Sequence, residues 1–174
     1  MTSIRFEEIY SRFFLKTEAN DLFSSSLPEE IRNELLCGYV HIAIADPVVR
    51  KLFSSIWISD PHIGENDSGK IRIDGLLEYE MEEASSDEED KEFVLDVISD
   101  GMVLAWIDPK LNSIKNISQL ISDSDKKFYA QSTHIQANRD LRLDIRLHRD
   151  KLISDRDFID NEYLKGNISN VRED

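Results

Sequence analysis

The chain has 174 residues, of which 40% are hydrophobic and 32% are charged, and its net charge is −14 at pH 7. This composition is typical of a soluble globular protein and not of a disordered chain, and the length suits a single domain that buries a core. The acidic excess argues against a protein that coats DNA, because binding to phosphates requires a basic surface.

The N-terminal third predicts helices separated by short breaks. A first short helix is expected over residues 3–16, where apolar side chains share one side: Phe6, Ile9, Tyr10, Phe13 and Phe14. Glutamates within it leave no uninterrupted apolar core, so no signal peptide is expected. A second helical pattern begins at Ser26 and continues to Ile56. Asp46-Pro47 interrupts this pattern, either as a kink or as a boundary between two helices with Asp46 as the cap.

The segment between Trp57 and Ser86 lacks helical periodicity and predicts β structure. Around residues 70–82, apolar residues alternate with mostly polar ones, at Ile71, Ile73, Leu77, Tyr79 and Met81. Asp74-Gly75 suits a tight turn, which would make this a small hairpin or a bent strand. Residues 57–86 are therefore expected to project as an arm that another chain orders, because a connection of about 30 residues without helix is unusually long.

A capping box predicts the start of the central helix. Ser86 can cap it and Glu89 can complete the box, and the apolar residues that follow lie on more than one side. This helix is expected to end at Asp108-Pro109, because the residue before a proline is driven out of the helical region.

The last helix completes the predicted fold. It is expected from about Ser132 to Gly166, with a frayed tail at residues 167–174. The predicted fold is mainly α: one domain over residues 1–166, built as a bundle of four to five helices with a small β arm (residues 70–82) and a long C-terminal helix.

No group of catalytic or metal-binding residues stands out. Cys37 is the only cysteine, so no intrachain disulfide is possible. The loop that contains His62 does not match the ligand spacing of a calcium loop, and His148 with Asp144 suits a pair on a helix surface. We therefore expect no enzymatic activity, no metal and no organic cofactor. No stretch approaches the roughly 20 apolar residues of a membrane span, so the protein is expected inside the cell or in a particle assembled there.

A run of acidic residues surrounds the start of the predicted central helix. Nine carboxylates fall within fifteen residues, opposed only by Lys91: Glu78, Glu80, Glu82, Glu83, Asp87, Glu88, Glu89, Asp90 and Glu92. A solvated acidic surface is one explanation of this run. The other is that it contacts a basic surface on a neighbouring copy of the chain.

Four arginines of the last helix are spaced by three or four residues and share one face: Arg139, Arg142, Arg146 and Arg149. Aspartates are interleaved with them, so pairing within the helix is one explanation. The alternative is an interface with an adjacent subunit or a portal protein, with residues 78–92 as the acidic partner. The apolar residues of the arm are expected in the same interface: Ile71, Ile73, Leu77 and Tyr79.

Residues 93–165 resemble the small head–tail connector proteins (neck or adaptor rings) of tailed bacteriophages. The resemblance lies in GMVLAWIDPKLNS and in KKFYAQSTHIQANRDLRLDIRLHRDKLISD. In that family a central helix ends in a tryptophan-containing turn and a proline, and a polar loop leads through a Phe-Tyr start into a long charged helix. The resemblance implies a helical bundle whose arm embraces the next subunit in a ring, commonly a dodecamer, between portal and tail.

The resemblance also implies partners and a location. The expected partners are further copies of the chain, the portal protein and another neck or tail protein. DNA would pass through the ring without specific binding, and an acidic lumen is compatible with the net charge of −14. The expected location is the neck of the virion, assembled in the host cytoplasm.

Two other function classes stay open. An acidic DNA mimic or inhibitor would also lack catalytic residues, and it would bind a basic nuclease or DNA-binding protein as a small species in solution. An enzyme whose site forms only between subunits is the second alternative, against which the lack of clustered ligands argues. The mass of the purified protein separates a ring from a mimic.

Overall fold

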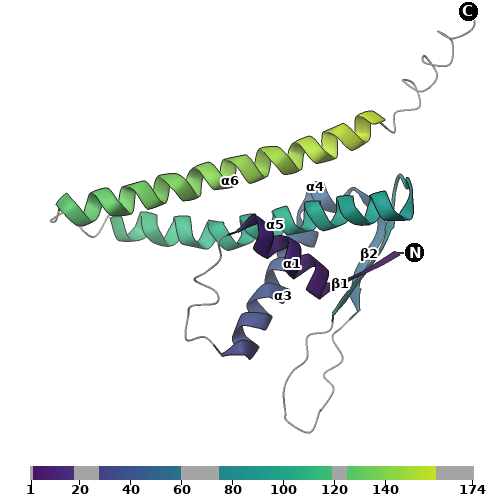
Figure 1. Cartoon of the computed structure of the whole chain (residues 1–174), viewed down its shortest axis with the longest axis horizontal. Helices are drawn as coiled ribbons and strands as arrows, with labels where there is room; N and C mark the ends of the chain where they lie inside the picture. The colour runs from purple at the N-terminus through teal and green to yellow at the C-terminus, as the bar shows by residue number, and fades with distance from the viewer. Residues whose placement is uncertain (1, 18–27, 60–74, 119–124, 160–174) are drawn as a thin grey trace, which may run out of the picture.

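The structure is a computed structural model that describes residues 2–17, 28–59, 75–118 and 125–159 (Figure 1). The described part is mainly helical with one small antiparallel sheet, which confirms the predicted fold class. In chain order its elements are β1 (Thr2–Arg5), α1 (Phe6–Lys16), α3 (Glu29–Ala45), α4 (Pro47–Arg50), β2 (Phe53–Ser59), β3 (Leu76–Met81), α5 (Asp87–Ser118) and α6 (Asp125–Ile159).

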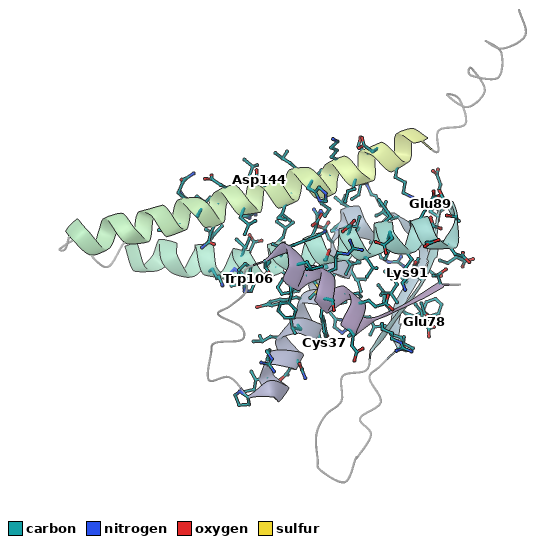
Figure 2. All side chains as sticks on the ribbon, viewed as in Figure 1. Cys37, Glu78, Glu89, Lys91, Trp106 and Asp144 are labelled. Atoms are coloured by element: carbon teal, nitrogen blue, oxygen red, sulfur yellow. The ribbon has the colours of Figure 1, made fainter. Side chains whose placement is uncertain are left out.

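Helix α5 is the central element, as its sequence predicts. Its middle turns are buried on several sides, so that Val94, Ile98 and Met102 are each 0% exposed. Helices α1, α3 and α6 all pack against it, and α6 runs along its length (Figure 1). At one contact Trp106 of α5 meets Phe13 of α1 edge-on, with ring centroids 6.3 Å apart (Figure 2). The apolar residues on several faces of α5 therefore place it between three other helices.

The start of α5 is confirmed and its end is not. The backbone N–H of Glu89 donates to Oγ of Ser86, 3.3 Å away, as a capping box requires. The helix does not stop at Asp108-Pro109 but continues through Pro109 to Ser118. An interior proline costs a helix about 3 kcal/mol. Ile107 and Leu111, on either side of it, are both buried, and we attribute the continuity of the helix to this packing.

Asp46-Pro47 is a boundary between two helices. Helix α3 ends at Ala45, and the side chain of Asp46 accepts a hydrogen bond of 2.9 Å from the N–H of Val48 at the start of α4. The predicted continuation of helix to Ile56 is wrong, because β2 begins at Phe53. Its β-branched and aromatic residues pair with β3, and this tertiary contact outweighs the apolar spacing that suggested a helix. The expected cap Ser26 lies outside the described residues.

The sheet has the order β1-β3-β2, with both neighbours antiparallel to β3. Leu77 and Tyr79 of β3 are 0% and 1% exposed, so they belong to the core of the chain itself. Their predicted place in an interface of a projecting arm is therefore wrong. Of the rest of the expected arm, residues 57–59 lie in β2. Residues 60–74, which include Ile71 and Ile73, lie outside the described part.

The last helix is long, as predicted, but it begins earlier. Helix α6 starts at Asp125, seven residues before the expected Ser132, and is described to Ile159. The predicted frayed tail at residues 167–174 lies outside the described part.

Candidate functional site

Helix α6 is held to the rest of the chain by three arginines and one histidine. Each meets a carboxylate of α5 or of the α3–α4 junction, and Arg142, Arg149 and Arg156 are spaced by seven residues, which keeps the three arginines on one side of the helix. The contacts are Arg142–Asp108 at 2.6 Å, His148–Asp100 at 2.8 Å, Arg149–Asp46 at 2.8 Å and Arg156–Asp90 at 2.6 Å.

Arg149 is a buried residue and not a surface one. It is 5% exposed, and its terminal nitrogen donates to Oδ2 of Asp46, 2.8 Å away. A buried guanidinium is stable only when a carboxylate compensates its charge. The sequence-based assignment of Arg149 to a subunit or portal interface is therefore wrong, because this residue joins α6 to the α3–α4 junction within one chain.

Asp100 of α5 joins three helices. Its carboxylate is 0% exposed, and its two oxygens have different partners. Oδ1 accepts from Nζ of Lys16 in α1 at 2.7 Å, and Oδ2 lies 2.8 Å from Nδ1 of His148 in α6. Lys16 also contacts Asp96 at 3.0 Å. This arrangement explains how a buried carboxylate is tolerated, and it shows that His148 pairs across the helices and not with Asp144.

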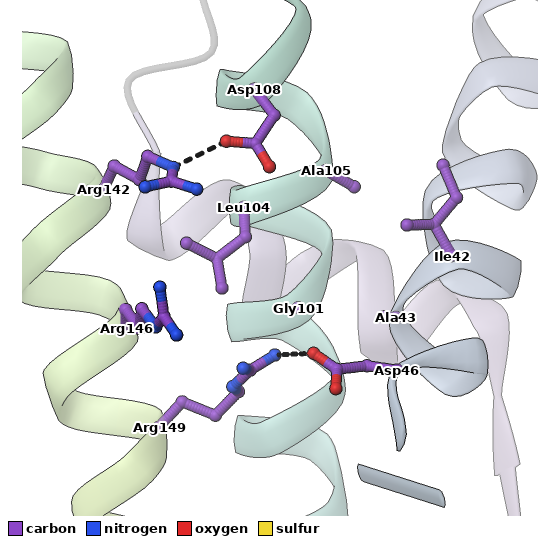
Figure 3. Close-up of a pocket in the computed structure, with 10 residues that line it drawn as sticks. All are labelled: Ile42, Ala43, Asp46, Gly101, Leu104, Ala105, Asp108, Arg142, Arg146 and Arg149. Carbon is purple, nitrogen blue, oxygen red and sulfur yellow. Dashed lines mark hydrogen bonds and ion pairs between the residues drawn. The ribbon is translucent and has the colours of Figure 1, made fainter. Parts of the chain in front are cut away.

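An open cleft of about 220 Å³ lies between α3, α5 and α6 (Figure 3). Ile42 of α3 and Leu104 of α5 give it an apolar side, and Arg142, Arg146 and Arg149 of α6 line the other side. Two carboxylates, those of Asp46 and Asp108, face these three guanidiniums. We call this site the arginine cleft. In a chain of charge −14, it is a local surface where cations outnumber carboxylates.

Arg146 carries the surplus charge of the arginine cleft. Its side chain is 59% exposed, and the carboxylate that it approaches among the described residues is Asp150, one turn along α6, at 3.9 Å. At that distance no hydrogen bond forms. Arg139 is also exposed, and it lies outside the cleft. Of the four predicted arginines, Arg149 is buried and pairs with Asp46, and Arg142 pairs with Asp108. Arg139 and Arg146 are exposed.

The acidic run is divided by the fold as well. Asp90 is 4% exposed and pairs with Arg156, while Glu92 pairs with Arg12. On the sheet, Glu78 accepts from the indole N–H of Trp57 at 2.8 Å, and Glu80 lies 3.4 Å from the hydroxyl of Ser55. The remaining carboxylates are exposed and form no ion pair with any described residue: Glu82, Glu83, Asp87, Glu88 and Glu89. We call residues 82–89 the acidic turn.

The acidic turn and the arginine cleft do not meet within one chain. Glu78 and Glu89 lie near the sheet end of the molecule, whereas Asp144 lies midway along α6 (Figure 2). Among the described residues, the hydrogen bonds between the acidic run and α6 are made by Arg156, which donates to Asp90 and to the carbonyl of Glu83. Sequence reasoning missed Arg156, although its position seven residues after Arg149 places it on the same face.

Two exposed apolar patches accompany the charged groups. On α3, Ile31, Leu35 and Ile42 are 44%, 37% and 57% exposed and share one face, because they are four and seven residues apart. On α6, Leu143 and Leu147 are 55% and 58% exposed, one turn apart, on the side away from the buried residues. We call these the α3 ridge and the α6 leucine pair.

Comparisons with protein-family models, with curated proteins and with solved structures find no match to this chain. Among the residues that the structure describes, no helix is both long and apolar enough to cross a membrane.

Proposed function

We propose that the chain is a structural subunit of a ring of identical copies, which joins the portal to the tail of a tailed bacteriophage. The observation that carries this proposal is the α6 leucine pair. Two leucines more than half exposed on one helix face are costly in water, and burying each against another chain contributes about 1.5–3 kcal/mol. Helix α6 therefore offers a contact surface that the described part of its own chain leaves uncovered.

The presence of a second, different patch supports a ring over a simple dimer. A two-fold dimer uses one patch twice, whereas a ring built head to tail requires two different patches on each subunit. The α3 ridge and the α6 leucine pair lie on different helices and face solvent in the single chain. Two such patches are what cyclic assembly needs.

The charge of the chain is consistent with the passage of DNA. Each copy would carry a net charge of −14, and every residue of the acidic turn is exposed. Repulsion between like charges prevents phosphates from adhering to such a surface. A ring of these subunits would let DNA through without retaining it.

Native mass spectrometry of the purified protein, alone and after mixing with the portal, tests the proposal. The expected result is one closed oligomer of defined copy number, formed by the protein itself or on the portal. The same polypeptide is expected in neck complexes isolated from virions. A protein that remains a monomer in both samples, and that is missing from virions, would refute the proposal.

A second candidate is supported by the acidic turn. Its exposed carboxylates, which are unpaired among the described residues, suit a mimic of DNA that binds a basic protein. Such a mimic would be a monomer or dimer, and it would form a salt-sensitive complex with a nuclease or another DNA-binding protein. The mass measurement separates the two functions.

A further inference from the structure

The arginine cleft holds more hydrogen-bond donors than its own carboxylates use. Arg142 donates through Nε to Asp108, and Arg149 donates through a terminal nitrogen to Asp46 (Figure 3). Each guanidinium carries five N–H groups, so most of them remain available. Arg146 makes no hydrogen bond to a carboxylate among the described residues. The cleft can therefore accept another anionic group without displacing either existing ion pair.

A buried donor points to the same conclusion. Nε of Arg149 is shielded from solvent and has no hydrogen-bond acceptor in the described structure. Leaving such a charged group unsatisfied costs more than 1 kcal/mol, and a buried donor without a protein partner is commonly satisfied by a bound water or ion. Arg146 and Arg149 both line the cleft, so both observations are consistent with an added oxyanion at this site.

The chemistry of the chain favours a carboxylate over a phosphate of nucleic acid. DNA and RNA carry a charge on every phosphate, so a molecule of charge −14 repels them along their whole length, whereas a protein presents its carboxylates among neutral and basic side chains. A short acidic protein segment carries far fewer charges than a nucleic acid, and its carboxylates match the guanidiniums that line the cleft. The favoured ligand is thus a protein carboxylate.

We propose that the arginine cleft of one copy binds the acidic turn, residues 82–89, of the next copy. This inference rests on the proposed ring, because it names the partner of the cleft within it. The acidic turn is exposed throughout, and its carboxylates make no ion pair with described residues of their own chain. It lies at the sheet end, away from the middle of α6, so a head-to-tail contact brings the two charged surfaces together (Figure 2).

A peptide-binding experiment tests the site without requiring a ring. The probe is a synthetic peptide of residues 82–89 with blocked ends, titrated into the isotope-labelled full chain and followed by the NMR signals of the arginine side chains. Binding is expected to perturb Arg146 first, and Arg146→Gln is expected to weaken it about tenfold. Arg139→Gln is the matched control, an exposed arginine of the same helix outside the cleft, and is expected to leave binding unchanged.

Two further arms of the titration identify the ligand. A peptide with its acidic residues replaced by Asn and Gln is expected not to bind. Inorganic phosphate is expected to bind more weakly than the acidic peptide; equal or tighter binding would show a general anion site and overturn the assignment to the acidic turn. Absence of peptide binding, or equal loss with Arg139→Gln, would overturn it too.

Assembly of charge-reversed variants separates the inference from the proposed function. Arg146→Glu is expected to abolish the oligomer, and so are Glu88→Arg and Glu89→Arg together. A chain that carries all three substitutions is expected to form the oligomer again. At each interface the cleft then presents a glutamate and the acidic turn presents two arginines, so opposite charges face each other again. Rings that form equally well with Arg146→Glu would overturn the inference and leave the ring intact. If the wild-type protein binds the peptide but never oligomerises, the proposed ring is refuted, whereas the binding site in the arginine cleft is supported.

Discussion

At the scale of single residues, two glycines in helices have opposite surroundings. A Cβ placed on Gly101 of α5 would lie 2.6 Å from Cβ of Ala43 and 3.1 Å from its Cα, so α3 and α5 approach each other too closely for a side chain. A Cβ placed on Gly38 of α3 would meet nothing within 4 Å. The same substitution should therefore have opposite effects at the two positions.

Gly101→Ala is expected to reduce the free energy of unfolding by about 1–3 kcal/mol, because it forces α3 and α5 apart. Gly38→Ala is expected to raise it by about 0.5–1 kcal/mol, because alanine loses less backbone entropy than glycine in a helix. Urea unfolding followed by circular dichroism measures both. A Gly101→Ala protein as stable as wild type would show that the two helices are not in close contact.

The buried tyrosine of the sheet gives a second effect at this scale. Burial, and then the neighbouring carboxylates of Asp90 and Asp87, raise the pKa of Tyr79 from 10.0 to about 12. Folding thus stabilises the neutral phenol, and this contribution is complete below pH 10. It is lost as the pH rises from 10 towards 12, since the unfolded chain then ionises first.

Tyr79→Phe is expected to flatten the fall in unfolding free energy between about pH 10 and pH 12. The phenylalanine ring keeps the edge-on contact with Phe53, whose centroid lies 5.7 Å away, so stability at neutral pH should change little. Burial and the nearby Cys37 also raise the pKa of Tyr10. Part of the dependence of the unfolding free energy on pH should therefore persist in the Tyr79→Phe protein. Identical pH profiles for wild type and variant would contradict the assignment to Tyr79.

At the scale of elements, the attachment of α6 depends on charge as much as on apolar contact. Its inner face buries Ile153 and partly buries Ile135, Leu141 and Ile145, and three arginine cations and His148 also meet carboxylates. The most buried of these cations is Arg149, whereas Arg146 is one turn earlier and exposed. Substitutions at these two arginines can therefore distinguish the role of buried ion pairs, which attach α6 to α5 and α3, from the role of an exposed charge on the same helix.

Arg149→Met is expected to lower the free energy of unfolding by about 1–3 kcal/mol, because it leaves Asp46 without its partner. Arg146→Met is the matched control and should stay within about 0.5 kcal/mol of wild type, as is usual for exposed positions. Native-state hydrogen exchange should show faster exchange in α6 for Arg149→Met alone. Equal stability of the two variants would mean that the Arg149–Asp46 pair does not hold α6.

At the scale of the whole molecule, net charge opposes association while local patches favour it. Copies of charge −14 repel one another over distances that salt screens, with a Debye length of about 10 Å at 0.1 M salt. The α3 ridge and the α6 leucine pair gain from burial at any ionic strength. Salt should therefore weaken the repulsion between copies more than it weakens the apolar contact.

Ring formation is expected to increase as salt is raised from about 0.01 M to about 0.15 M, because long-range repulsion is screened over this range. Mass photometry at fixed protein concentration measures the fraction of subunits in the ring. The unfolding free energy over the same salt range controls for effects on folding itself. A ring fraction that falls steadily as salt rises would contradict this prediction, because it would mean that the attraction between the arginine cleft and the acidic turn exceeds the long-range repulsion between whole copies.

Local sequence patterns determined much of the fold. The period of 3.6 residues predicted the central and last helices, and the period of two predicted β3. Capping chemistry placed the start of α5 at Ser86 and the break between α3 and α4 at Asp46. These features depend on residues that are close to one another along the chain, and for that reason they can be predicted from the sequence. The exposure of an acidic turn and of cations on α6 was predictable on the same grounds.

Only the tertiary structure decided which of these charged residues form ion pairs within the chain. Asp46 pairs with Arg149, and Asp100 pairs with Lys16 and His148, although these residues are far apart in sequence. The continuation of α5 through Pro109 and the pairing of β2 with β3 likewise depend on distant packing partners. Four arginines with similar spacing therefore look equivalent in the sequence. The packing of α6 on α5 and α3 buries Arg149 and leaves Arg146 exposed, because burial is set by neighbours that the local pattern does not contain.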